Sequence, residues 1–286
     1  MPASKPPSAR GRQLAAELRR LREAATLTGD DVATRLKWSA SKVSRIETGR
    51  SAVSAGDLRM LLDLYEVTGS VRDRLTELGR TAAQRGWWDA FGDILGSGYS
   101  TFLALEDDAE SERFYAQMIV PGILQTERYA EEIMREGLFT APPGEIVRRV
   151  QARMTRQRLL TKNDPLELSV ILDESALRRR VGGGDVMAGQ LSHLIDIAEL
   201  PNVGLQVLPF AGGAHIAMDG SFVVLRFPGP VPSYLVYLEH MTGQLVIENE
   251  GEAYHYALSY DRLRGLALEP EDSISFIAQI AREMNN

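Results

Sequence analysis

Apolar side chains recur at helical spacing throughout residues 11–85. Leu14, Leu18 and Leu21 repeat at positions i, i+4 and i+7, with polar residues opposite them, as in a helix that buries one face. A further helix is expected over residues 70–84, and the three helices between open with side chains that cap helices: Thr28, Ser39 and Ser54. The pattern predicts an all-α domain of five helices.

After Gly86-Trp87-Trp88 the pattern changes, and strand-like runs appear among the helices. Helices are expected over residues 102–117, 126–136, 144–160, 184–198, 261–268 and 271–283. Strands are expected over residues 166–173, 203–209, 221–227, 234–238 and 244–249. A helix between the first two strands is typical of a parallel crossover, whereas the short connections between later strands favour antiparallel pairing. We therefore predict an α/β domain with a mixed sheet and helices.

Charge divides the chain in the same place. Residues 1–85 hold 16 Lys and Arg against 10 Asp and Glu, whereas residues 86–286 hold 16 against 29, so balances of +6 and −13 make up the net charge of −7. A basic end on an acidic body is typical of a nucleic-acid-binding module, although a basic tail with a solvated helix face fits the charge equally well. The domains expected are a Pro- and Ser-rich disordered tail (1–10), a helical domain that is the candidate for binding nucleic acid (11–85) and an acidic domain (86–286).

Composition excludes several classes of protein. The chain has no Cys, which rules out disulfides, thiol catalysis and Cys-based zinc sites. The long uncharged stretch over residues 201–218 contains polar groups and prolines and is no membrane span. Residues 1–13 lack the apolar core of a signal peptide. We therefore expect a cytoplasmic protein with no membrane partner.

Residues 29–48 fit the frame of a helix-turn-helix motif. A small residue, Ala33, stands at position 5 of this frame, where two helices must approach closely. Such spacing lets one helix pack steeply across the next and leaves the outer face of the second helix free for the major groove of DNA. The alternative is an ordinary helical hairpin. Apolar residues are needed at positions 4, 8, 10, 15 and 18, and here these are Val32, Leu36, Trp38, Val43 and Ile46.

The run Ser44-Arg45-Ile46-Glu47-Thr48-Gly49-Arg50, after Leu36-Lys37-Trp38-Ser39, resembles the Cro/C1-type (xenobiotic-response-element, XRE) helix-turn-helix family over about residues 12–68. The third helix, Ser39–Thr48, is then the one that enters the major groove. The family's turn glycine is replaced by Lys37, so we expect a turn that needs no positive φ. Base-reading residues implied by the resemblance are Ala40, Ser41, Ser44 and Arg45, and the residues implied to lie near phosphates are Thr28, Lys42 and Arg50.

Two of these implied roles have a clear chemical basis. Arg45 is the one side chain of the set that is able to bind guanine through two hydrogen bonds. Glu47 corresponds to a structural residue of the family, and the residue that aligns with its arginine partner is Arg22.

A second resemblance covers nearly all of residues 87–284. The run Val120-Pro121-Gly122-Ile123-Leu124-Gln125-Thr126, followed by Tyr129-Ala130 and later by Pro201-Asn202-Val203-Gly204-Leu205, resembles the large domain of uncharacterised function found in actinobacterial antitoxin-like regulators. The resemblance implies a small companion protein encoded nearby. From its residues alone, the apolar segment 120–126 is either the wall of a groove for a partner or effector or a buried turn.

No constellation of residues points to catalysis. Asp173 and Glu174 follow a predicted strand but have no second converging group, and the four His lack the spacing of metal ligands. Neither a nucleophile elbow nor a phosphate-binding glycine loop is present. We therefore expect no catalytic residue, metal or cofactor. A metabolic enzyme whose helical end resembles the motif is the competing class.

These observations predict a sequence-specific DNA-binding transcriptional regulator that is not an enzyme. One recognition helix reads only a few base pairs, so a homodimer held by the acidic domain is expected on a palindromic site in double-stranded DNA. The acidic domain is expected to bind the companion protein, as in an antitoxin-like pair. The alternative is a pocket for a small effector molecule in that domain.

Overall fold

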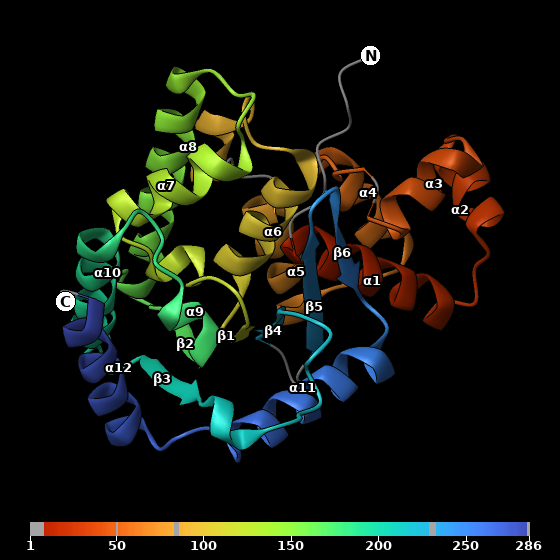
Figure 1. The fold of residues 1–286 in the computed structure, drawn as a ribbon. Coiled ribbons are helices and arrows are strands. Elements are labelled where there is room, and N and C mark those ends of the chain that lie inside the picture. The colour runs from red at the N-terminus through yellow and green to blue at the C-terminus, as the bar shows by residue number, and fades with distance from the viewer. Residues whose placement is uncertain (1–8, 50, 83–85, 229–232, 285–286) are drawn as a thin grey trace. The chain divides into compact units, whose positions relative to one another are not determined.

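The computed structural model describes residues 9–49, 51–82, 86–228 and 233–284 (Figure 1). The chain divides into two compact units, one of residues 1–92 and 99–108 and one of residues 93–98 and 109–286. The first is helical, and the second contains a mixed six-stranded sheet with helices. The predicted fold class, an all-α N-terminal domain followed by an α/β domain, is confirmed.

Capping side chains set where the helices of the first unit begin. Thr28, Ser39 and Ser54 each accept a hydrogen bond from a backbone N–H in the first turn of the helix that follows, as predicted. A 3₁₀ turn, η1 (Trp87–Phe91), and α6 (Ser97–Asp108) come after these helices. The five helices expected from the pattern are α1 (Ala9–Ala24), α2 (Gly29–Leu36), α3 (Ala40–Glu47), α4 (Ala55–Leu64) and α5 (Gly69–Ala82).

The inner faces of these helices form one apolar core. Leu14 and Leu18 of α1 are buried in it, and Leu21 packs against it. Helix α5 approaches α4 so closely that a Cβ on Gly79 would lie 2.4 Å from Cδ2 of Leu58. Other buried members of the core are Val32, Ala33, Val43, Ile46, Leu61, Leu62 and Leu75. The apolar positions of the helix-turn-helix frame therefore face inward, with Leu36 and Trp38 packed at the margin of the core.

The turn between α2 and α3 differs from the prediction. Lys37 has φ 55° and ψ 40°, in the left-handed region, so the expectation of a turn without positive φ is wrong. The Lys37 N–H donates to the Thr34 carbonyl at 3.3 Å. The Trp38 N–H donates to the Ala33 carbonyl at 2.8 Å. This pair of bonds is a Schellman motif, which satisfies the last carbonyls of α2 and requires a left-handed residue at position 37 whatever its side chain.

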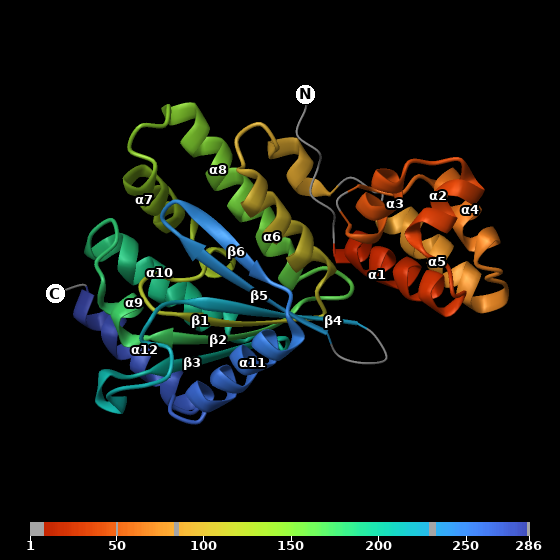
Figure 2. The ribbon, with the colours of Figure 1, turned by 90° about the vertical axis from the view of Figure 1, so that its right-hand side faces the viewer.

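The second unit is built on a sheet with the strand order β3-β2-β1-β4-β5-β6 (Figure 2). Strands β1, β2 and β3 run parallel, and the remaining neighbours are antiparallel. The predicted parallel crossover and the predicted antiparallel pairs are confirmed. The strands are β1 (Ser111–Ala116), β2 (Glu167–Asp173), β3 (Val203–Leu208), β4 (Phe222–Phe227), β5 (Ser233–His240) and β6 (Gly243–Ile247).

Strand β1 was not predicted. We expected one helix over residues 102–117, but α6 ends at Asp108 and residues 111–116 form a central strand. Phe114 of this strand pairs with Val170 of β2 on one side and with Val223 of β4 on the other. Because both partners lie far along the chain, local periodicity does not reveal them, and the long-range pairing overrides the helical pattern.

Helices cover both faces of the sheet. Ala253 and Ala257 of α11 pack on one face, and α10 lies on the other side of the sheet in Figure 2. Helix α11 begins at Glu250 rather than at residue 261, because Asn249 caps it. None of the described helices has the length and apolar character of a membrane span. The helical elements of this unit are η2 (Gly122–Leu124), α7 (Glu127–Gly137), α8 (Pro143–Arg156), η3 (Gln157–Leu160), α9 (Glu174–Arg178), α10 (Gly184–Ile197), η4 (Phe210–Gly212), α11 (Glu250–Arg264) and α12 (Pro270–Met284).

The conformation of Lys37 predicts that Lys37→Gly stabilises the first unit. A side chain in the left-handed region costs about 1–2 kcal/mol, and the greater freedom of glycine in the unfolded chain offsets part of this, so we expect a net gain of about 1 kcal/mol in the free energy of unfolding. All three Trp of the chain, Trp38, Trp87 and Trp88, lie in this unit, so tryptophan fluorescence in a urea titration reports its unfolding.

Lys37→Ala is the matched control, since it removes the same charge but keeps a Cβ. An equal gain from alanine would show that the lost charge, and not the backbone conformation, is responsible.

Candidate nucleic-acid interface

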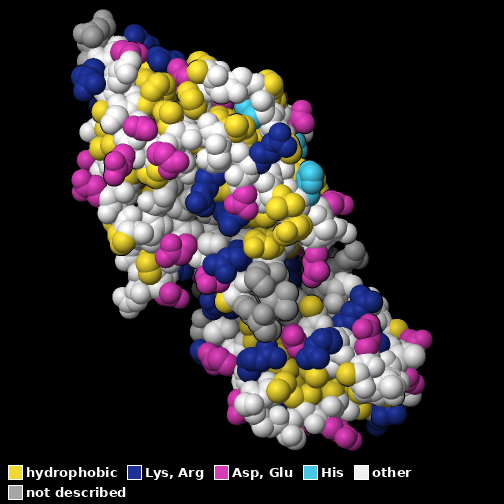
Figure 3. Space-filling model, turned by 90° about the horizontal axis from the view of Figure 1, so that it is seen from below, with side chains coloured by type: hydrophobic (Ala, Val, Ile, Leu, Met, Phe, Trp, Pro, Cys, Tyr) yellow, Lys and Arg dark blue, Asp and Glu magenta, His cyan; other side chains and the backbone are white. Residues whose placement is uncertain are grey.

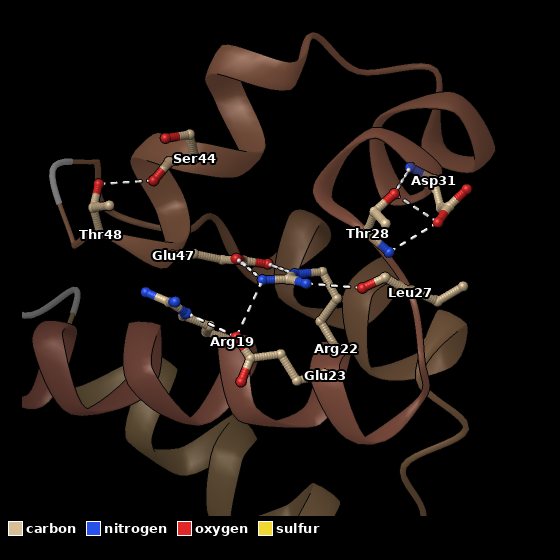
Figure 4. A network of polar contacts seen from close by, with 9 residues as sticks. All are labelled: Arg19, Arg22, Glu23, Leu27, Thr28, Asp31, Ser44, Glu47 and Thr48. Carbon is tan, nitrogen blue, oxygen red and sulfur yellow. Dashed lines mark hydrogen bonds and ion pairs between the residues drawn. The ribbon is translucent and has the colours of Figure 1, made fainter.

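The inner side of α3 is joined to α1 by an ion pair (Figure 4). Nε of Arg22 donates to Oε1 of Glu47 at 2.7 Å, and Nη2 donates to Oε2 at 2.9 Å. Nη1 of the same side chain donates to the Leu27 carbonyl at 2.8 Å. The side chains of Arg22 and Glu47 are only 13% and 10% exposed, and the hydrogen bonds to Glu47 raise the pKa of the Arg22 guanidinium. The pair expected between these two residues is therefore present in the folded chain.

The outer side of α3 carries the four residues expected to read bases. Val43 and Ile46 point into the core, and this orientation turns the opposite side of the helix to solvent. The hydroxyls of Ser39 and Ser41 lie 3.1 Å apart at the start of the helix. The four residues Ala40, Ser41, Ser44 and Arg45 are all exposed. The structure thus brings them together on one accessible surface.

Arg45 differs from Lys42, the other cation of α3, in having a side chain without a partner among the described residues. Within the described ranges, no hydrogen bond or ion pair engages its guanidinium. Only its backbone carbonyl accepts hydrogen bonds, from the Ser51 N–H at 3.1 Å and from the Thr48 hydroxyl at 3.5 Å. All donors of the guanidinium are therefore available to an external ligand.

Lys42 is engaged inside the unit. Its Nζ lies 2.8 Å from Oδ1 of Asp57, in the first turn of α4, and 3.9 Å from the centroid of the Trp38 ring. From its sequence Lys42 is expected near phosphate, and no role is expected for Asp57. The sequence does indicate that Asp57 lies in the first turn of a helix, since it comes three residues after the cap Ser54. That position does not show which distant cation the Asp57 carboxylate faces.

Thr28 and Asp31 form a capping box at the start of α2 (Figure 4). The N–H and the hydroxyl of Thr28 donate to Oδ2 of Asp31 at 2.8 and 2.6 Å. These bonds lower the pKa of the Asp31 carboxyl. A phosphate at Thr28 would have to compete with this carboxylate, and the role of Thr28 stays a prediction. Arg50, the third residue expected near phosphate, lies outside the described residues.

The segment of residues 120–126 is a buried turn. Gln125 holds the segment from inside, because its Nε2 donates to the Val120 carbonyl at 2.7 Å. Gln190 of α10 holds the rest, donating to the Leu124 carbonyl at 2.8 Å and accepting from the Thr126 N–H at 2.7 Å. Val120, Pro121, Ile123, Leu124 and Gln125 are buried, and Gly122 and Thr126 are half-buried. The segment was expected to be either the wall of a groove or a buried turn. Its burial agrees with the buried turn, because its apolar side chains do not line an open groove.

A buried polar cluster in the second unit was not foreseen. The Tyr115 hydroxyl lies 3.4 Å from Oδ2 of Asp173 and 3.4 Å from Nε2 of His215. Burial raises the pKa of Tyr115, and the nearby Asp173 carboxylate raises it further. Asp173 also caps α9 through the Ser175 N–H at 2.9 Å, and Glu174 accepts a hydrogen bond from the Phe210 N–H at 2.8 Å. Both acids thus have structural partners.

Comparison with protein families identifies both units. A family model described as "Helix-turn-helix domain" matches residues 13–75, and one described as "Domain of unknown function (DUF5753)" matches residues 99–279. No curated protein and no solved structure matches the chain. The two resemblances inferred from the residues are confirmed at the level of these domains, and the first domain indicates a DNA-binding regulator.

The ion pair between Arg22 and Glu47 predicts a large effect for Glu47→Gln. The substitution removes the main counter-charge of a nearly buried guanidinium, which keeps, among the described residues, only the exposed Glu23 carboxylate at 3.7 Å, so we expect the free energy of unfolding of the first unit to fall by about 2 kcal/mol. The measurement is the urea titration followed by tryptophan fluorescence.

Glu77→Gln is the matched control, because Glu77 pairs with Arg80 on the surface of α5 with both side chains more than half exposed. We expect this change to leave the unfolding midpoint where it is. Equal effects of the two substitutions would mean that the inner pair does not stabilise the motif.

Proposed function

The chain belongs to the DUF5753 family and carries a helix-turn-helix domain, and we propose that it is a sequence-specific DNA-binding transcriptional regulator. The observation that carries the proposal is the division of α3 into two sides. Its inner side is held by Val43, Ile46 and Glu47. Its outer side is exposed and bears short or unpaired polar side chains, as a helix that enters the major groove requires.

Base reading is assigned to Ala40, Ser41, Ser44 and Arg45. The guanidinium of Arg45, which has no partner among the described residues, has the donor geometry to bind O6 and N7 of guanine together. The serine hydroxyls both donate and accept, and the methyl group of Ala40 fits against a thymine methyl. The short side chains beside Arg45 also allow the helix to approach the base edges.

Phosphate contacts are assigned to the start of α2 at Thr28 and to Arg50, whereas Lys42, which the sequence also placed near phosphate, is held by Asp57. Such contacts set the position of the protein on DNA and carry no sequence information. Lys42 has to leave Asp57 to make one, and Thr28 has to share its donors with Asp31.

The acidic domain is proposed to form a homodimer, which would place two recognition helices on a palindromic site. The half-sites of such motifs are usually about 34–36 Å apart. A single α3 presents too few side chains for a long site, and two copies double the sequence that is read.

The same domain is proposed to bind a small companion protein, as in actinobacterial antitoxin-like regulators. Loops after β1 and β3 support this, because they expose apolar side chains, and the side-chain amide of Gln117 joins them by donating to the Met218 carbonyl at 3.4 Å. Hydrophobic side chains also reach the surface in patches bordered by charged ones (Figure 3). Exposed apolar surface of this kind favours a protein partner. The exposed residues are Met118, Ile119, Phe210, Ile216 and Met218.

The alternative, a pocket for a small effector, has less support. Its expected wall, residues 120–126, is largely buried. We also propose that the chain is not an enzyme, since Asp173 and Glu174, its nearest candidates for catalytic acids, are used for capping and for bonding a loop.

Arg45→Ala tests the base-reading assignment. Loss of one bidentate contact costs about 1–3 kcal/mol, so we expect specific affinity to fall by roughly tenfold to a hundredfold while affinity for mixed-sequence DNA falls much less. The measurement is fluorescence anisotropy with a duplex from the region upstream of the protein's own gene.

Arg80→Ala is the control, since it removes the same charge from the exposed surface of α5. If Arg45→Ala and Arg80→Ala reduce specific affinity equally, then Arg45 does not read a base.

The proposal for the acidic domain predicts a stable assembly of two chains with the companion. We expect co-expression of the full chain with the neighbouring small open reading frame, followed by native mass spectrometry, to give a dimer that carries the small protein. A single chain that retains a small molecule and no companion would instead support the effector alternative.

A further inference from the structure

Lys42 is the only lysine on α3, and two groups hold its ammonium. The Asp57 carboxylate lies 2.8 Å from Nζ, and the Trp38 ring lies beneath it with its centroid at 3.9 Å. The Lys42 and Asp57 side chains are 35% and 23% exposed, so the pair is accessible from one side and packed on the other. Such a pair is screened less by salt than one that is fully in water.

The position of Asp57 is itself fixed by the fold. Its backbone N–H donates to the Ser54 hydroxyl at 3.1 Å, in the cap of α4. Its carboxylate also lies in the first turn of α4, where the helix dipole favours negative charge. Asp57 therefore stays beside Lys42 without any help from DNA.

We propose that Asp57 competes with DNA phosphate for Lys42 and thereby lowers the affinity of the recognition helix for DNA of every sequence. The inference rests on the proposed DNA-binding function. A phosphate that replaced Asp57 at Lys42 would exchange one anion for another and would lie close to the displaced carboxylate. The exchange therefore yields little free energy, so Lys42 remains paired with Asp57 when DNA is bound.

This arrangement favours specificity over affinity. Phosphate contacts strengthen binding to correct and incorrect sites alike, whereas Arg45 distinguishes between them. Neutralising Lys42 within the protein leaves the free guanidinium of Arg45 as the main charged contact of the exposed side of α3.

The test compares four forms of the full chain: the wild type, Asp57→Asn, the double variant Lys42→Met/Asp57→Asn, and Asp63→Asn. The probe is a fluorescein-labelled duplex of about 30 base pairs of mixed sequence, titrated between 50 and 200 mM salt, a range over which phosphate contacts change the affinity strongly. Lys42→Met keeps an unbranched apolar side chain beside Trp38. Asp63→Asn removes the same charge further along α4, where Asp63 pairs with Arg72.

Asp57→Asn is expected to bind about tenfold more tightly at 50 mM salt and to steepen the salt dependence by about 0.9, because one more phosphate is neutralised. The double variant is expected to match the wild type within about twofold and with the same slope, since it removes a pair that is already neutral. Asp63→Asn is expected to stay within about twofold of the wild type.

Two results would overturn the inference while leaving the DNA-binding function in place. One is an Asp57→Asn protein that binds as the wild type does. The other is a double variant that binds more weakly with a slope shallower by about one unit, which would mean that Lys42 already holds a phosphate. Failure of every form to bind the duplex would overturn both the inference and the proposed function.

Discussion

The placement of α3, the proposed recognition helix, depends on the ion pair between Arg22 and Glu47. Helix α3 has eight residues, too few for a helix to be stable alone, and Val43 and Ile46 are the buried residues among them. Two apolar contacts leave the rotation of a short helix about its axis poorly defined, whereas a doubly hydrogen-bonded pair fixes it. Since the same guanidinium also holds the Leu27 carbonyl, one side chain joins α1, α3 and the connection that leads into α2.

Once that rotation is fixed, the charges of α3 fall into three positions with different partners. Glu47 faces inward and is neutralised by Arg22, and Lys42 lies at the flank and is neutralised by Asp57. Ser44 and Arg45 lie three and four residues after Ser41 and so share the outer side of the helix with it. Among these residues, Arg45 is the one cation whose side chain has no partner in the described part of the chain. Its guanidinium is also the group with the chemistry to read a base.

Features set by local chemistry could be predicted from the sequence, and features set by distant partners could not. The caps Thr28, Ser39 and Ser54 act within a few residues of themselves, and the pattern located them. Strand β1 depends on β2 and β4, and the partner of Lys42 depends on how α4 packs, so neither has a local signature. Lys37 is a different case, because its left-handed conformation is required by the carbonyls of α2 and not by its own side chain.

The residues by which a family is recognised need not be the residues that bind its partners. The buried turn of residues 120–126 is an example. The turn is held by Gln125 and Gln190 inside the unit, where a change of shape would disturb several packed neighbours at once. A run of residues that is recognisable across a family and lies in the packed interior therefore reflects how the domain packs. Loops on the surface carry no such constraint, and binding residues are found there more often than in the core. In this unit the exposed Met118, Phe210 and Met218 lie on such loops, where a partner would be able to contact them.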